Sequence, residues 1–63
     1  MRLLIREIRE RQGLSQNKLG AKAGITAASI SLIESYKRSP TLKNLEKIAK
    51  ALNVKVRDLL DED

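Results

Sequence analysis

The side chains in this sequence that could do chemistry are mostly cationic. Thirteen Lys and Arg stand against eight Asp and Glu, and the chain has no His and no Cys. The scattered serine hydroxyls therefore have no histidine base to activate them as nucleophiles, and the usual zinc ligands are missing. There is also no Gly-rich phosphate loop or apposed carboxylate pair. The sequence argues against an enzyme and predicts no metal, no cofactor and no small-molecule ligand.

The charge is unevenly distributed. Residues 1–57 hold all thirteen basic side chains and four acidic ones, which gives +9, and the other four acids give −4 within the last six positions. That acidic end consists of Asp58, Asp61, Glu62 and Asp63. A basic body suits a polyanion such as nucleic acid, although a basic surface can also serve solubility alone. The initial Met and the acidic end favour a complete small protein, and the alternative is that the sequence is the N-terminal domain of a longer one.

The apolar residues bear on location. No apolar stretch approaches the ~20 residues that would span a bilayer. A basic amphipathic membrane binder is disfavoured because the apolar stripes are needed for one core and the chain lacks aromatic anchors. The absence of Cys fits a reducing compartment. We therefore expect a cytoplasmic protein with no membrane partner.

These side chains must be positioned by short helices, since 63 residues form one small domain (1–63). Apolar spacing and capping residues predict helices over residues 2–12, about 16–23, about 26–35, from 41 to 52 and from 56 to 60. Leu42, Leu45, Ile48, Ala49 and Leu52 form one continuous apolar stripe. Ser15, Thr26 and Thr41 are the expected N-caps. Gly24 and Asn53 are expected to end helices in the left-handed conformation.

The second and third of these helices have the spacing of a helix-turn-helix. In that motif the first helix crosses the DNA backbone and the second enters the major groove. Gly24 supplies the positive φ of the sharp turn, and Gly20 lacks a side chain where the two helices pass closely. Ile25 and Ile30 are expected to bury their side chains beneath the turn.

With these features the sequence resembles the Cro and phage-repressor (XRE-type) helix-turn-helix family over almost its whole length. The resemblance is carried by the segments IREIRERQGLSQNKLGAKAGIT, SISLIE and SPTLKNLEKIAKALNV. It implies an all-α, compact five-helix domain of the phage-repressor, lambda-repressor-like type. It also implies a transcriptional regulator, most often a repressor, that binds double-stranded DNA as a homodimer on a palindromic operator.

The resemblance assigns roles to individual positions. It implies that Arg9 and Glu34 form a structural ion pair. The positions implied to face base edges are Ala27, Ala28, Ser31 and Leu32, with Ser29 beside them. The positions expected to approach DNA phosphates are Gln16, Thr26, Tyr36, Lys37, Arg38 and Lys43. Gln16 is also implied to brace the recognition helix.

Two features depart from the family pattern. The base-facing positions carry Ala, Ser and Leu, whereas bidentate contact with guanine or adenine needs Arg, Lys, Asn or Gln. We therefore expect apolar contact with thymine methyl groups, supported by phosphate contacts and DNA deformability. Tyr36 stands where the family commonly has Gly, and a positive φ there would cost about 1 kcal/mol or more. Either the turn differs in shape, or the ring is held by packing or by a phosphate, or its hydroxyl lies in water.

The first turns of three predicted helices, at 16–18, 27–29 and 42–44, contain no Asp or Glu. Acidic residues are favoured there in ordinary helices because free N–H groups and the helix dipole attract negative charge. Their absence leaves these N-termini available to phosphate groups. Chance is the competing explanation for nine positions.

The C-terminal segment and Leu32 keep a second function open. Val54, Val56, Leu59 and Leu60 either form a two-fold dimer contact or complete the core of the monomer. Dimerisation would place two recognition helices ~34 Å apart on one face of the DNA. The alternative to DNA binding is a helix-turn-helix module that binds protein, such as an antitoxin or adaptor subunit.

Overall fold

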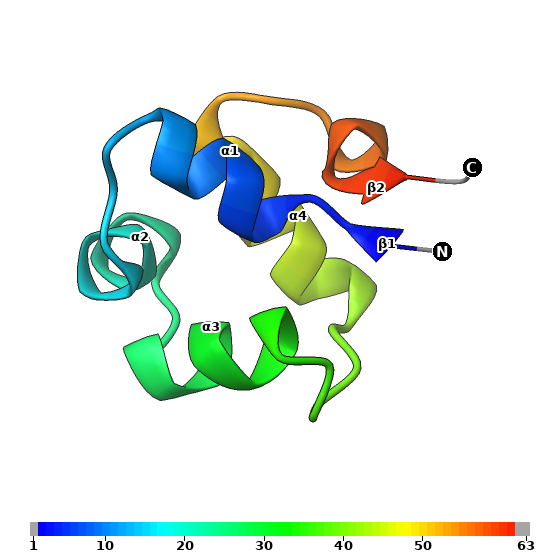
Figure 1. Ribbon diagram of the computed structural model, residues 1–63, viewed down its shortest axis with the longest axis horizontal. Coiled ribbons are helices and arrows are strands. Elements are labelled where there is room, and N and C mark those ends of the chain that lie inside the picture. Colours follow the sequence, from blue (N-terminus) through cyan, green and yellow to red (C-terminus); the bar gives the residue numbers. More distant parts are fainter. Residues whose placement is uncertain (1, 62–63) are drawn as a thin grey trace.

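The computed structural model describes residues 2–61, and Glu62 and Asp63 of the acidic end lie outside the described residues. The chain order is β1 (Arg2–Leu3), α1 (Ile5–Arg11), α2 (Gln16–Ala23), α3 (Ala27–Glu34), α4 (Leu42–Leu52), the 3-10 helix η1 (Val56–Leu59) and β2 (Leu60–Asp61). In Figure 1, α3 runs along the lower edge of the molecule, and β1 and β2 lie together at the right-hand side.

The expectation of five α-helices is wrong at both ends of the chain. The first helix begins at Ile5 rather than Arg2, because Arg2 and Leu3 pair in an antiparallel ladder with Asp61 and Leu60. The expected fifth α-helix is a single 3-10 turn followed by extended backbone. This pairing lets the two ends satisfy backbone hydrogen bonds that a frayed helical turn would leave to water. Residues 2–61 thus form a mostly helical fold, with four α-helices and a small two-stranded ladder.

The predicted helix ends within the chain are confirmed. The side chains of Ser15, Thr26 and Thr41 each accept a hydrogen bond from the backbone N–H three residues later. Such caps stabilise a helix by about 1 kcal/mol each. Gly24 has φ 72° and Asn53 has φ 59°, which end α2 and α4 in the left-handed conformation.

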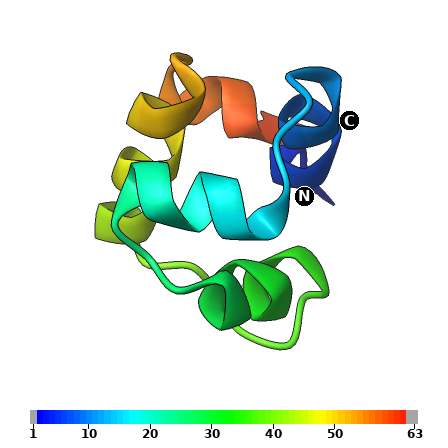
Figure 2. The ribbon, with the colours of Figure 1, turned by 90° about the vertical axis from the view of Figure 1, so that its left-hand side faces the viewer.

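The core is aliphatic and lies between the helices. α2 packs against both α3 and α4 (Figure 2), and α1 also contacts α4. A Cβ atom on Gly20 would lie 2.5 Å from the backbone oxygen of Ile25, so the expected close approach of α2 to the turn is confirmed. The buried hydrophobic residues are Ile5, Leu19, Ala23, Ile30, Ile33, Ile48, Ala49, Leu52 and Leu59.

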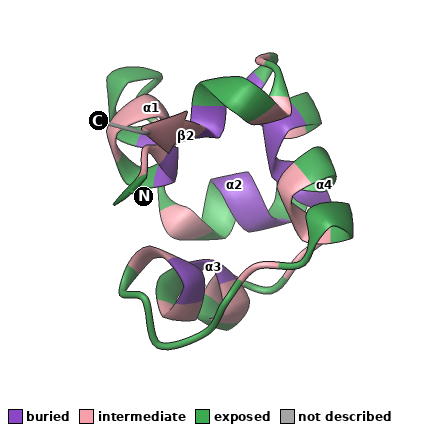
Figure 3. Cartoon of the chain, turned by 90° about the vertical axis from the view of Figure 1, so that its right-hand side faces the viewer, coloured by how far each residue is buried: buried purple, intermediate pink, exposed green. Residues whose placement is uncertain are grey.

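Leu42 does not belong to the apolar stripe of α4. Its side chain is 66% exposed, whereas Ile48, Ala49 and Leu52 are buried. Leu42 is the first residue of α4, one turn before the point where the helix meets the core. Figure 3 shows the buried parts of the helices turned towards the centre of the molecule. Among the described residues, no helix is long and apolar enough to cross a bilayer.

Candidate nucleic-acid interface

α3 presents a face of small side chains. It is held on the body by Ile30 and Ile33, which are fully buried. On the rest of the helix, Ala28 and Ser31 are exposed, whereas Ala27, Ser29 and Leu32 are half-buried. Residues 27–34 include no Lys, Arg, Asn or Gln. Its own side chains therefore supply small hydroxyl and methyl groups but no long hydrogen-bonding group.

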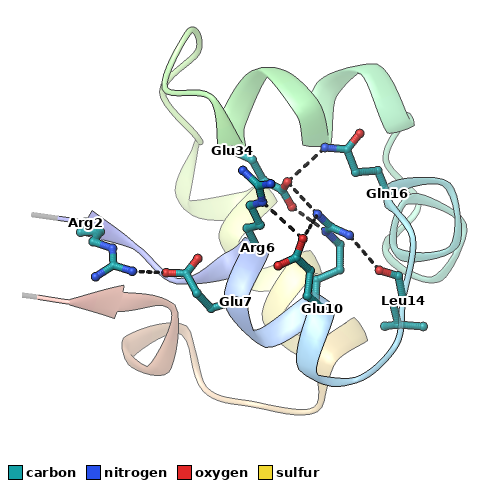
Figure 4. Close-up of polar contacts among 8 residues, drawn as sticks. Arg2, Arg6, Glu7, Glu10, Leu14, Gln16 and Glu34 are labelled. Atoms are coloured by element: carbon teal, nitrogen blue, oxygen red, sulfur yellow. Dashed lines mark hydrogen bonds and ion pairs between the residues drawn. The ribbon is translucent and has the colours of Figure 1, made fainter.

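A buried ion pair braces the far end of α3. Arg9 Nε donates to Glu34 Oε2 at 2.8 Å, and Arg9 Nη2 donates to Glu34 Oε1 at 3.1 Å (Figure 4). Arg9 Nη1 also donates to the backbone oxygen of Leu14 at 2.8 Å. The side chains of Arg9 and Glu34 are only 9% and 5% exposed. The hydrogen bond with Glu34 raises the pKa of Arg9 above its ordinary value, so the guanidinium stays charged across the physiological range.

Gln16 joins this pair from the first residue of α2. Its side-chain Nε2 donates to Glu34 Oε1 at 3.1 Å (Figure 4). One carboxylate therefore links three helices, namely α1 through Arg9, α2 through Gln16 and α3 through Glu34 itself. The sequence suggested these partners only through a family resemblance, because the three positions are far apart along the chain.

A second cluster lies at the start of α3 and was not expected from the sequence. Arg38 Nη1 donates to Ser29 Oγ at 3.0 Å, and the Thr26 hydroxyl also donates to Ser29 Oγ at 3.0 Å. Thr26 Oγ1 in turn accepts the backbone N–H of Ser29 at 3.1 Å. Thr26 and Arg38, which were expected to contact phosphates, thus both donate to Ser29, which was expected beside the bases. No local pattern links Ser29 to Arg38 nine positions later.

The loop after α3 folds back onto the helix. The backbone N–H groups of Lys37 and Arg38 both donate to the backbone oxygen of Leu32, at 3.0 and 3.2 Å. Tyr36 makes this turn at φ 63°. This positive φ costs a tyrosine about 1 kcal/mol, and the two hydrogen bonds to Leu32 are of the size needed to offset it. Tyr36 therefore adopts a left-handed conformation at the position where the resemblance leads us to expect glycine.

The hydroxyl of Tyr36 is not simply solvated. It accepts the backbone N–H of Leu3 at 3.1 Å, although the residue is 60% exposed. Leu3 belongs to β1, so the ring joins the loop after α3 to the paired chain ends. A phenol can accept one hydrogen bond and donate another, so its O–H remains suited to a phosphate oxygen.

The helix starts nearest these clusters carry no acidic residue. The first turns of α2, α3 and α4 lack Asp and Glu, whereas those of α1 and η1 contain Glu7 and Asp58. Lys37 and Lys43 are exposed, the first in the loop after α3 and the second in the first turn of α4. The region can therefore attract anions both through side chains and through free backbone N–H groups.

The C-terminal apolar residues divide into two kinds. Leu59 is fully buried and completes the core of the monomer, so its side chain is closed to a partner subunit. Val54 and Val56 are half-buried against that core, and Leu60 is half-buried opposite Leu3 in the ladder. A dimer contact from this segment would rest on these last three residues.

Comparison with known proteins gives a consistent answer. Residues 5–59 match the family model HTH_3, described as helix-turn-helix. The chain is 37% identical over 59 residues, 94% of this chain and 84% of the relative, to an uncharacterized HTH-type transcriptional regulator of Archaeoglobus fulgidus. It is also similar to the restriction-modification controller protein C.AhdI from Aeromonas hydrophila. That structure has a TM-score of 0.87 and 34% identity, covering 89% of this chain and 85% of that one.

A further similar structure contains DNA. It is the Bacillus subtilis biofilm regulator SinR in complex with DNA, with a TM-score of 0.84 and 36% identity over 90% of this chain and 92% of that one. The positions expected at DNA in this chain lie on α3, in the loop after it, and in the first turns of α2 and α4. The chain belongs to the XRE-type helix-turn-helix family and is a DNA-binding transcriptional regulator.

Proposed function

We propose that this protein is a cytoplasmic repressor that binds a palindromic operator as a homodimer, with α3 in the major groove. The observation that carries the proposal is the surface around α3. It combines exposed small side chains on the helix, three helix starts without acids, and the cations Lys37, Arg38 and Lys43. Such a surface can approach the negatively charged duplex closely because nothing acidic in those first turns repels the phosphates.

The phosphate contacts are proposed to come from the edges of this surface. Lys37 and Lys43 offer mobile ammonium groups, and the O–H of Tyr36 offers a donor held in place by its bond with Leu3. Gln16 keeps one side-chain N–H and its backbone N–H for a phosphate while it braces Glu34. Thr26 is proposed to contribute through the N-terminal turn that it caps, since its hydroxyl hydrogen is used by Ser29.

Contacts with the bases are proposed to include thymine methyl groups. Ala28 is exposed and Ala27 and Leu32 are half-exposed, so all three offer methyl groups to a C5-methyl. Replacing thymine by uracil in the operator should weaken binding at the contacted positions. Unchanged binding of the uracil duplex would refute this part of the proposal.

The dimer is proposed to form through the C-terminal segment, with Leu60, Val54 and Val56 as its apolar contacts. Two-fold symmetry would then set the half-sites about one helical turn apart. Sedimentation equilibrium with and without DNA measures this directly. Replacing Leu60 by Lys should weaken self-association, and a monomer bound to a single half-site would refute the dimer.

The test of the whole proposal is selection from a randomised duplex pool, followed by titration at several salt concentrations. We expect an inverted repeat to be enriched, with an affinity that falls steeply as salt rises. Lys37→Gln should weaken binding to all sequences and reduce the salt slope by about one. The matched control is Lys50→Gln, which removes the same charge from the last turn of α4. An absence of enrichment would refute the proposal and favour a protein-binding module.

A further inference from the structure

We infer that Arg38, from the loop after α3, contacts a guanine in the major groove and supplies the specificity that the side chains of α3 lack. This inference rests on the proposed DNA contact through α3. It changes the role expected for Arg38, which the sequence placed at a phosphate.

α3 lacks the side chains that could read a purine base. Bidentate contact with a purine needs two hydrogen-bonding groups on one long side chain. Residues 27–34 contain only Ala, Ser, Ile, Leu and one Glu. The carboxylate of that residue, Glu34, already accepts hydrogen bonds from Arg9 and Gln16. If a guanine is specified at this surface, the donor pair must therefore come from outside the helix.

The head group of Arg38 contacts the start of α3. Its Nη1 donates to Ser29 Oγ, so the guanidinium lies on the first turn of α3. Ser29 is half-buried, and its own backbone N–H is fixed by the capping hydroxyl of Thr26. The N-terminal residues of a recognition helix are the ones that meet base edges. The guanidinium is therefore held where an α3 side chain would make a base contact.

The backbone of Arg38 is also bonded to α3. Its N–H donates to the backbone oxygen of Leu32 near the other end of α3, and the N–H of Lys37 donates to the same oxygen. Arg38 is thus attached to α3 at both ends of its side chain, through Leu32 and through Ser29. A side chain held in this way loses less conformational entropy on binding than a free surface arginine.

The Arg38 guanidinium keeps hydrogen-bonding capacity for a base. A guanidinium has five N–H donors in a planar fork, and within residues 2–61 one of them is used, by Ser29. The rest of the fork can donate two parallel hydrogen bonds to N7 and O6 of a guanine. Ser29 acts as a positioning residue, because it orients the guanidinium and leaves the fork for the base.

The experiment compares operator preference and salt dependence for Arg38→Ala, Arg38→Lys and the matched control Arg11→Ala, which removes an exposed arginine from the end of α1. For the wild type we expect one guanine per half-site to be strongly preferred. Arg38→Ala should lose about 5- to 100-fold in preference at that position and retain the rest of the motif. Arg38→Lys keeps the charge and can still donate to a guanine, but it lacks the planar fork, so its preference should lie between those of the wild type and Arg38→Ala.

Two further measurements separate a base contact from a phosphate contact. Placing 7-deazaguanine at that position removes the N7 acceptor, so it should weaken the wild type but leave Arg38→Ala unaffected. Ser29→Ala removes the hydroxyl that orients Arg38, so it should reduce the same preference several-fold. It changes no charge, so the salt slope should stay the same. The helix cap should also survive, because Thr26 accepts the backbone N–H of residue 29.

The outcomes are distinct. If Arg38→Ala weakens all sequences equally, lowers the salt slope by about one and keeps the wild-type motif, Arg38 is a phosphate contact and the inference is overturned. If the wild type itself enriches no sequence, the proposed function has failed instead.

Discussion

Removing the carboxylate of Glu34 should be among the most damaging single changes to this fold. Arg9 would keep its bond to the Leu14 backbone and its 4.0 Å contact with the exposed Glu10. It would lose the ion pair and both hydrogen bonds with Glu34, at a side-chain exposure of only 9%. Breaking a buried ion pair by removing one partner costs about 3–5 kcal/mol. A domain of this size has roughly 3–9 kcal/mol of total stability. We therefore expect Glu34→Ala to lose a large part of the free energy of unfolding.

Urea denaturation followed by far-UV circular dichroism measures this loss. The matched control is Glu46→Ala, which removes the same side chain from an exposed position on α4 and should change stability by less than about 0.5 kcal/mol. Glu34→Gln should be intermediate, because an amide oxygen can still accept from Arg9 but carries no charge. The ion pair raises the pKa of Arg9, so its contribution to stability is fully present at any pH below the ordinary pKa of arginine. The stability lost in Glu34→Ala should therefore not vary between pH 6 and pH 9.

A double variant keeps the reasoning testable if Glu34→Ala does not fold. Arg9→Met together with Glu34→Leu replaces both charges by apolar groups of similar size, which is often neutral or stabilising for buried pairs. We expect this variant to recover most of the lost stability. Equal denaturation midpoints for Glu34→Ala and the wild type would refute the assignment of a buried, stabilising pair.

Three further changes test local features of the fold, each by thermal or urea denaturation. Gly20→Ala should destabilise by about 1–3 kcal/mol, because its new Cβ meets the backbone oxygen of Ile25 at 2.5 Å; a gain in stability would contradict that close approach. Tyr36→Phe should cost about 0.5–1.5 kcal/mol through loss of the bond from Leu3, and protection of the Leu3 amide against hydrogen exchange should fall with it. Thr41→Ala should cost about 1 kcal/mol by removing the cap of α4, and Thr41→Ser should restore most of it.

The sequence by itself determined the central helices and the turn between α2 and α3. Those features depend on neighbouring residues. A capping hydroxyl bonds a backbone N–H three residues later, and Gly24 makes its left-handed turn within its own backbone. Apolar residues spaced by three or four positions also identified the buried face of α4 from Leu45 onwards. Local chemistry of this kind is visible in the sequence because the interacting groups are close along the chain.

Only the tertiary structure decided which distant residues meet. The pairing of β1 with β2 replaced the ends of two predicted helices, since its hydrogen bonds join residues almost sixty positions apart. The same holds for the bond between Tyr36 and Leu3, and for the position of the Arg38 guanidinium on Ser29. These contacts form because the packed helices bring otherwise unrelated segments together. A periodic pattern along the chain records which face is buried, but not which side chain lies opposite it.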